Sequence, residues 1–177
     1  MKRILLAAAA ALLVNAGAGL AAPPEPRSAE DLARILKNNQ LLAAQGEPGA
    51  QDYMGVMYKK GQGVRQDHVE AVRLFRLAAA QGNANAQVNL AVMYEYGLGV
   101  AQDYAAALDW YRRAAAQGDG KGQFGVGWMY AKGQGVKQDY AEALKWYRLA
   151  VAQSLVEKFW WEQRDEVAHQ GGHGDDD

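Results

Sequence analysis

The sequence repeats itself every 36 residues, and this period restricts the fold more than any single residue does. The positions that recur at this spacing are Tyr58, Tyr94 and Tyr130; Gly61, Gly97 and Gly133; Gly63, Gly99 and Gly135; Val64, Val100 and Val136; Asp67, Asp103 and Asp139; Ala71, Ala107 and Ala143; and Arg76, Arg112 and Arg148. A period of this length is typical of stacked repeat arrays, in which each unit buries its apolar face only against its neighbours. Arrays of this kind present an extended binding surface and seldom build a catalytic pocket.

Each repeat is predicted to contain two helices. In the second copy, the segment from Ala86 to Tyr96 places Leu90 and Met93 on one face at helical spacing. Gly97 follows, and glycine adopts the left-handed backbone that ends a helix without steric cost. Val100 is apolar within the next turn, so we expect its side chain to pack into the core.

The second helix of each repeat is predicted to begin at an aspartate. Asp103 precedes a helical segment that runs to Ala116, and its carboxylate can accept hydrogen bonds from the first backbone amides. Gly118 is expected to close this helix. Acidic residues three positions apart further predict capping boxes, with Asp in the Ser/Thr position, at Asp67 with Glu70 and at Asp139 with Glu142.

The pattern common to the three copies resembles a known repeat. It is A-x-x-x-L-G/A-x-x-Y-x-x-G-x-G-V-x-x-D-x-x-x-A-x-x-W-x-x-x-A-A-x-x-G, and it resembles the Sel-1-like repeat, a longer-looped relative of the tetratricopeptide repeat. The resemblance extends from Ala50 to about Ser154, with Leu74 in place of Trp, Ala91 in place of glycine and Ser154 in place of the closing glycine. It implies an all-α, right-handed α-α superhelix (solenoid) with a role as an adaptor or scaffold.

The flanking residues complete the predicted organisation. Lys2 and Arg3 precede an apolar run from Ile4 to Val14, which predicts a secretory signal peptide, because the run is too short to span a bilayer comfortably. Cleavage is expected after Ala21, with an earlier site after Ala18 and an uncleaved anchor as the alternatives. The predicted segments are a signal peptide at 1–21, a Pro-rich leader at 22–27, an N-terminal capping helix (a partial repeat) at 28–49, repeats at 50–85, 86–121 and 122–154, a C-terminal capping helix at 155–169 and a disordered tail at 170–177.

Charge and composition exclude several classes of function. Loss of the signal peptide removes Lys2 and Arg3 from the 19 Lys and Arg residues, which leaves 17 against 20 Asp and Glu. This mild acidity argues against nucleic acid as a partner, since nucleic-acid-binding proteins present basic faces. We also expect no stable membrane insertion after cleavage. Because the chain has no Cys, no disulfide can stabilise it.

The residue inventory gives little support to catalysis. The chain contains no Cys and no Thr, its only serines are Ser28 and Ser154, and no His-Glu-x-x-His helix is present. We therefore expect a protein that is not an enzyme, with no catalytic residue and no cofactor. In the tail, His169, His173 and the terminal aspartates could chelate a divalent metal ion, but the flexible glycines favour a solvated tail without a metal site.

The first helices vary between copies at positions that line the concave face of tetratricopeptide relatives. Mapping those positions onto this chain predicts a partner-binding set of Asp52, Val56, Lys59, Lys60, Val88, Val92, Glu95, Tyr96, Phe124, Trp128 and Lys132. Val88, Val92, Phe124 and Trp128 would form an exposed apolar floor, which is typical of a protein or peptide contact, with Glu95 and the lysines at its rim. The alternative is that curling of the superhelix or the C-terminal cap buries this stripe.

These observations predict an exported, periplasmic or secreted scaffold or adaptor that binds a protein or a peptide in a concave groove. The alternatives are a cell-envelope hydrolase or peptidoglycan-associated factor, and a purely structural stabiliser of a larger assembly. One local expectation concerns stability. Gly122 and Gly125 lie inside the predicted first helix of repeat three, where each glycine costs about 0.5–1 kcal/mol relative to alanine. Gly125→Ala should stabilise the fold unless close packing requires a bare backbone there.

Overall fold

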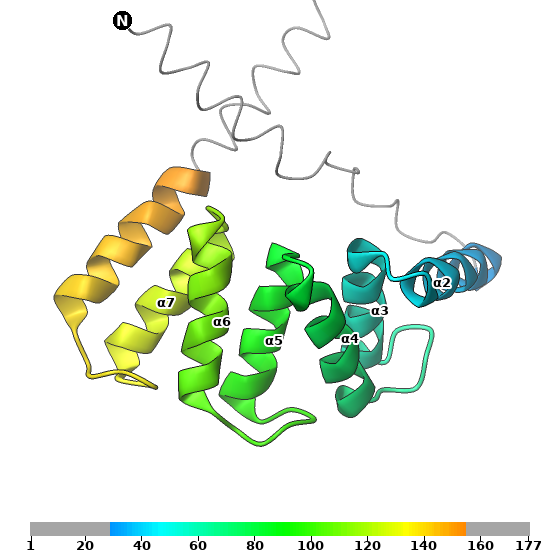
Figure 1. Cartoon of the computed structure of the whole chain (residues 1–177), viewed down its shortest axis with the longest axis horizontal. Coiled ribbons are helices and arrows are strands. Elements are labelled where there is room, and N and C mark those ends of the chain that lie inside the picture. The colour runs from blue at the N-terminus through cyan, green and yellow to red at the C-terminus, as the bar shows by residue number, and fades with distance from the viewer. Residues whose placement is uncertain (1–28, 155–177) are drawn as a thin grey trace, which may run out of the picture. The chain divides into compact units, whose positions relative to one another are not determined.

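The computed structural model describes residues 29–154, and all regular secondary structure within them is α-helical. The predictions for the signal peptide, the Pro-rich leader, the C-terminal capping helix and the tail lie outside these residues. The helices are α2 (Ala29–Ala44), α3 (Pro48–Lys60), α4 (His68–Ala80), α5 (Ala84–Tyr96), α6 (Tyr104–Ala116) and α7 (Gly120–Lys132), followed by a helix over residues 140–154, drawn in orange in Figure 1.

The described residues divide into two units between Arg34 and Ile35, within α2. Within the second unit, α3 packs on α4, α4 on α5, α5 on α6 and α6 on α7. The first helices of successive repeats also contact one another, α3 with α5 and α5 with α7, so they form one layer of the array (Figure 1). This arrangement confirms the predicted all-α repeat fold.

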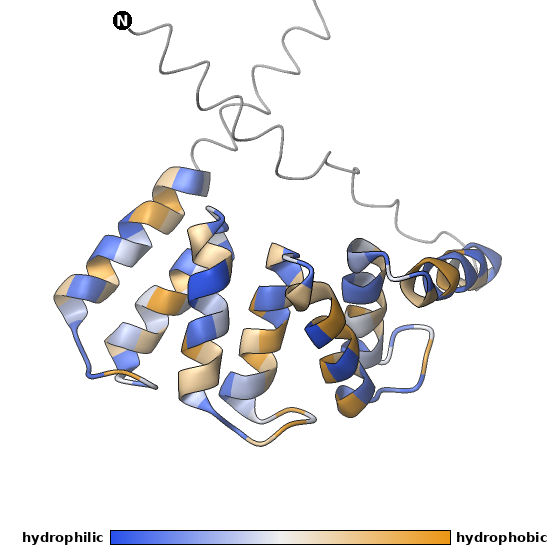
Figure 2. Cartoon of the chain, viewed as in Figure 1, coloured by the Kyte–Doolittle hydropathy of each residue, from blue (hydrophilic) through white to orange (hydrophobic). Residues whose placement is uncertain are grey.

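The core forms where small and large apolar side chains alternate between the two helix layers. The largest fully buried side chains are Phe75, Leu90, Met93, Val126 and Met129. Alanines on the second helices are also fully buried, which allows neighbouring helices to approach closely. Val100 is partly buried against this core, as the sequence predicted. Figure 2 shows that hydrophilic and hydrophobic residues are interspersed along the helices, as expected for helices that bury one side.

The helix ends confirm the predicted caps, with one correction. The carboxylate of Asp103 accepts from the Ala106 amide at 3.0 Å, and Gly97 ends α5 in the left-handed conformation with φ 65°. The capping boxes are only half formed, because the backbone amide of Asp67 already donates to the Tyr58 carbonyl at 3.0 Å and is not available to Glu70. The freed acidic side chains bind basic neighbours on their own helices instead, Glu70 with Arg73 and Glu142 with Lys145.

The first helices begin two residues earlier than the apolar pattern suggested. In the second repeat, the helix starts at Ala84 because Asn83 caps it, its side chain accepting from the Ala86 amide at 2.8 Å. Glu47 and Asp119 hold the same position before α3 and α7. The sequence analysis did not predict these caps.

Buried glutamines join successive repeats, a feature that the sequence analysis missed. Gln87 is 5% exposed; its amide nitrogen donates to the Ala79 carbonyl at 3.3 Å, and its amide oxygen accepts from Gln117 at 2.8 Å. Gln51 makes the equivalent contacts one period earlier, to the Ala43 carbonyl at 3.3 Å and from Gln81 at 2.9 Å. The last turn of α2 therefore meets α3 as the second helix of a repeat meets the helix that follows it.

Close packing accounts for the glycine at position 125. A Cβ atom there would lie 2.6 Å from Cε1 and 2.7 Å from Cγ of Tyr111, which is 5% exposed and held between helices. The bare backbone is therefore required at this point of contact between α6 and α7. Gly125→Ala is therefore not expected to stabilise the fold, because close packing requires a bare backbone at this position.

Candidate functional site

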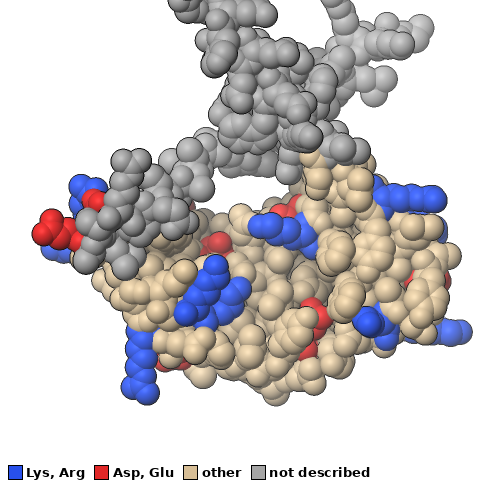
Figure 3. Space-filling view, turned by 180° about the vertical axis from the view of Figure 1, so that it is seen from behind, with Lys and Arg blue, Asp and Glu red and all other residues tan. Residues whose placement is uncertain are grey.

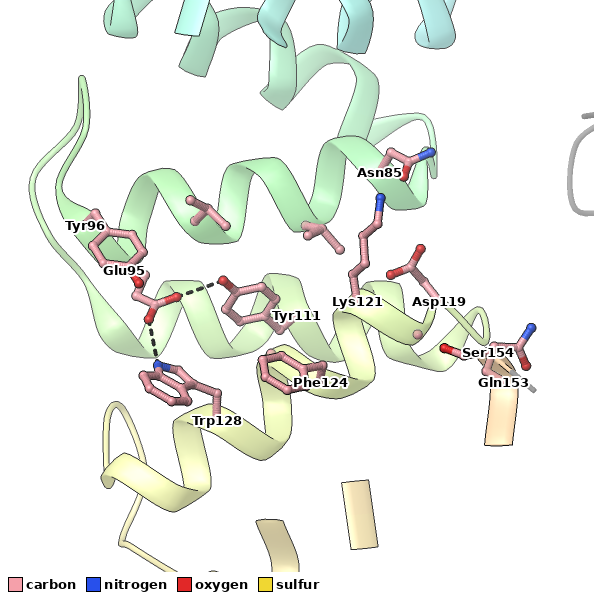
Figure 4. A pocket seen from close by; sticks show the side chains of 14 residues that line it. Asn85, Glu95, Tyr96, Tyr111, Asp119, Lys121, Phe124, Trp128, Gln153 and Ser154 are labelled. Carbon is pink, nitrogen blue, oxygen red and sulfur yellow. Dashed lines mark hydrogen bonds between the residues drawn. The ribbon is translucent and has the colours of Figure 1, made fainter. Parts of the chain in front are cut away.

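A solvent-open pocket of about 750 Å³ lies between α5 and α7. Its middle is apolar and is lined by Val88, Val92, Phe124 and Gly125. Phe124 remains 55% exposed, although its ring also packs against Tyr147 with the ring centres 5.1 Å apart. The two ends of the pocket differ in chemistry. Figure 4 shows one end formed by Glu95, Tyr96, Tyr111 and Trp128, and the other by Asn85, Asp119, Lys121, Gln153 and Ser154.

The first end is organised around the carboxylate of Glu95, which is 5% exposed. The Tyr111 hydroxyl donates to Oε2 at 2.8 Å, and the Trp128 indole nitrogen donates to Oε1 at 3.1 Å (Figure 4). Burial raises the pKa of Tyr111 well above its usual value, and the hydrogen bond to the Glu95 carboxylate raises it further. Tyr111 therefore stays protonated and remains a donor at any physiological pH.

The repeat register explains why a carboxylate is placed here. Lys59 and Glu95 occupy equivalent positions one period apart, and so do Phe75 and Tyr111. In the first repeat, the Lys59 ammonium lies over the Phe75 ring, 5.7 Å from its centre. In the second repeat, the aromatic residue gains a hydroxyl, and an acidic residue replaces the lysine and accepts its hydrogen bond. The exchange substitutes a charge-assisted hydrogen bond for a cation–π contact.

A second polar cluster connects α3 to α5. The Asn89 amide donates to Asp52 Oδ1 at 2.9 Å, and the Lys59 ammonium donates to Asn89 Oδ1 at 3.0 Å. Burial raises the pKa of Asp52, against the opposing effects of the Asn89 hydrogen bond and the Lys59 charge. Burial likewise lowers the pKa of Lys59. Asp52 and Lys59 therefore both form hydrogen bonds with Asn89, and each charge also favours the charged form of the other residue.

The predicted partner-binding residues divide into those that the pocket brings together and those that it does not. Those in the pocket are Val88, Val92, Glu95, Tyr96, Phe124 and Trp128. Those outside it are Asp52, Val56 and Lys59, which are partly buried on α3, and Lys60 and Lys132, which are exposed at the last residues of α3 and α7. Val56 packs against the core around Phe75.

Two placements differ from the sequence analysis. Glu95 was expected at the rim, but it is buried at the end of the pocket because Tyr111 and Trp128 draw its carboxylate inward. Trp128 was expected to be exposed, but it is partly buried against the core of α5, α6 and α7. Lys132 is the residue that remains outside, with its ammonium 4.7 Å from the centre of the Trp128 ring.

Sequence reasoning missed one residue at the Glu95 end of the pocket, Tyr111, and all five residues at the opposite, polar end. Tyr111 was not among the predicted partner-binding residues, and the signal that could have found it is the hydroxyl that Phe75 lacks at the same position. Asp119 caps α7, its carboxylate accepting from the Gly122 amide at 2.7 Å. The remaining missed residues at the polar end are Asn85, Lys121, Gln153 and Ser154.

Comparison with protein families identifies the repeat. A family model described as "Sel1 repeat" matches residues 48–83, 84–119 and 120–155, which together make up more than half of the chain. The chain belongs to the Sel1 repeat family. Proteins of this family generally mediate protein–protein interaction, and as a scaffold family they are generally non-catalytic. The comparisons give no support to the alternative of a cell-envelope hydrolase.

Solved structures of Sel1 repeat proteins from bacteria have the same fold. The protein c5321, a protective antigen present in uropathogenic Escherichia coli strains, is 40% identical with a TM-score of 0.67 over 70% of this chain and 27% of its own. A Sel1 repeat protein from Oxalobacter formigenes is 36% identical with a TM-score of 0.61 over 70% of this chain and 54% of its own. This chain therefore spans only part of the length of either protein.

Helicobacter pylori cysteine rich protein B is 18% identical, with a TM-score of 0.55 over 70% of this chain and 89% of its own. At this identity the likeness concerns the fold alone, and the present chain contains no Cys. Comparison with curated proteins gives no match.

Two further properties concern residues 29–154 only. None of the helices there has both the length and the apolar character needed to cross a membrane. The same residues contain no group of three or more His, Cys, Asp or Glu side chains that could hold a metal ion.

Proposed function

We propose that the layer formed by α3, α5 and α7 binds an extended segment of a partner protein, and that the pocket between α5 and α7 takes its anchoring side chain. The observation that carries this proposal is the solvent-open pocket of about 750 Å³ with Phe124 55% exposed on its apolar wall. Apolar side chains left exposed in a concave site are typical of ligand and peptide contacts. The interaction role of the family supports the same conclusion.

Within this proposal the predicted residues take different parts. Val88, Val92 and Phe124 form the apolar floor, and the exposed Lys60 and Lys132 lie at the margins of the layer. The remaining members of the proposed set are Asp52, Val56, Lys59, Glu95, Tyr96 and Trp128. The protein acts by binding and not by catalysis, which is the general behaviour of its family.

The distribution of charge in Figure 3 argues against nucleic acid as the partner. On the face that it shows, Lys and Arg side chains are separated from one another by broad uncharged surface, with Asp and Glu between them. A nucleic-acid-binding face would carry its basic side chains together in a patch or stripe.

The proposal predicts that Phe124→Ala weakens peptide binding by about tenfold or more, because aromatic anchors dominate the energy of such contacts. Peptides would be selected from a random display library against the full chain, and their affinities measured by fluorescence anisotropy. Leu149→Ala is the matched control, since Leu149 is 51% exposed but does not line the pocket. Selected peptides that bind Phe124→Ala as tightly as the wild type would place the binding face elsewhere.

We further propose that the protein is exported to the periplasm or secreted. Lys2 and Arg3 followed by the apolar run from Ile4 to Val14 support export. The intact mass of the protein recovered from the cell envelope should then correspond to a chain that begins at Ala22, or at Gly19 if the earlier site is used. A chain that retains Met1 and fractionates with the cytoplasm would contradict this.

A further inference from the structure

We propose that the Glu95 end of the pocket takes a cationic side chain, the guanidinium of arginine or the ammonium of lysine, from the partner segment. This inference rests on the proposed binding function and specifies its chemistry. Its basis is a buried carboxylate that opens onto a solvent-accessible pocket between aromatic residues.

The Glu95 carboxylate lacks a cation of its own. Its two partners, Tyr111 and Trp128, are neutral donors, and the ion pairs formed among residues 29–154 do not include it. A buried charge is costly unless an opposite charge and hydrogen bonds compensate it. A cationic guest would supply the missing charge.

The carboxylate also keeps the capacity to accept more hydrogen bonds. A carboxylate has about four acceptor positions on its two oxygens, and Tyr111 and Trp128 occupy one on each. Glu95 is one of the residues that line the pocket, so a guest there lies next to it. A guanidinium offers paired donors that suit the two oxygens of one carboxylate.

The aromatic residues around Glu95 favour the same guest. Tyr96 is 61% exposed at this end of the pocket, and Figure 4 shows it beside Glu95 and across from Trp128. Aromatic faces attract cations within about 6 Å of the ring centre. The chain uses this contact elsewhere, with Arg113 lying 4.5 Å from the centre of the Trp110 ring. An anionic guest would instead be repelled by the Glu95 carboxylate.

Lys132 does not fill this role itself. Its ammonium lies over the Trp128 ring at 4.7 Å, and its side chain is exposed at the last residue of α7. It is therefore close enough to show that this indole attracts cations, while it leaves the Glu95 carboxylate without an ion-pair partner.

The test uses peptides selected on the full chain, each synthesised with arginine, lysine, citrulline or norleucine at its anchoring position. Citrulline keeps the shape of arginine without its charge. We expect arginine→citrulline to weaken binding to the wild type by about tenfold or more. Glu95→Gln should weaken binding of the arginine peptide by a similar factor. The affinities of this variant for the arginine and citrulline peptides should lie within about twofold of each other.

Glu142→Gln is the matched control, because it removes the same charge from the exposed pair with Lys145, outside the pocket. It should leave the affinity of the arginine peptide unchanged. Equal binding of the arginine and citrulline peptides to the wild type would overturn the inference without use of any variant, and so would unchanged binding by Glu95→Gln.

The remaining outcomes separate this inference from the function on which it rests. Selected peptides that depend on Phe124 but contain no cationic anchor would retain the binding function and exclude a cation at Glu95. A library that yields no peptide would reject the binding function, and the inference with it. Analytical ultracentrifugation would show whether the wild-type chain self-associates. If it did, and if Glu95→Gln abolished this self-association, a second copy would occupy the pocket and the proposal of a cationic side chain from a different partner protein would be rejected.

Discussion

Gly99→Ala is expected to destabilise the fold by about 3 kcal/mol and to lower the melting temperature by about 6–12 °C. Gly99 has φ 67°, where a residue with a Cβ atom is strained. In addition, the new Cβ would overlap with the carbonyl group of His68 and lie 2.7 Å from the Val69 amide nitrogen. These are backbone atoms at the start of α4, so no side-chain rotation can relieve the overlap.

The control for this variant is Gly82→Ala. Gly82 also has positive φ, 87°, but an added Cβ would meet no atom within 4 Å. It should show only the cost of the left-handed backbone, about 1–2 kcal/mol. The difference between the two variants in thermal unfolding isolates the contact between the loop of one repeat and the second helix of the preceding one. Equal losses would mean that Gly99 is needed for its conformation alone.

The repeat period explains why so much of the fold could be predicted. Asp103 as an N-cap, Gly97 as the helix end and Val100 as a core residue all follow from local rules that act within a few residues. The period then applies each rule three times. The capping box failed because it depends on a longer contact, in which the Asp67 amide donates to the carbonyl of Tyr58 across the loop.

The site was harder to predict because it depends on differences between repeats. Aligning the copies indicated which first-helix positions vary, and six of those positions do line one pocket. The alignment gave no indication that Glu95 would turn inward, since that requires Tyr111 and Trp128 from two other helices. Contacts between residues 16 and 33 positions apart follow neither from the period nor from helical spacing.

The second large effect is expected from Gly125→Ala, which should destabilise the protein by about 1–2 kcal/mol. Alanine improves helix propensity by about 0.5–1 kcal/mol, but overpacking a closed core costs about 1–3 kcal/mol. The overpacking dominates because the new methyl group would displace the ring of Tyr111, which is 5% exposed and is held in place by its hydrogen bond to Glu95. Urea denaturation followed by circular dichroism measures the change.

Gly120→Ala, in the same helix, is expected to change the free energy of unfolding in the opposite direction. Its Cβ would meet nothing closer than 3.7 Å, and the second repeat already holds Ala84 at the equivalent position. It should therefore stabilise the protein by a few tenths of a kcal/mol, up to about 1. If both variants were stabilising, the contact between Gly125 and Tyr111 would not be as close as the structure shows. Because the Tyr111 hydroxyl donates to Glu95, the same displacement should reach the pocket, so Gly125→Ala is also expected to alter peptide binding.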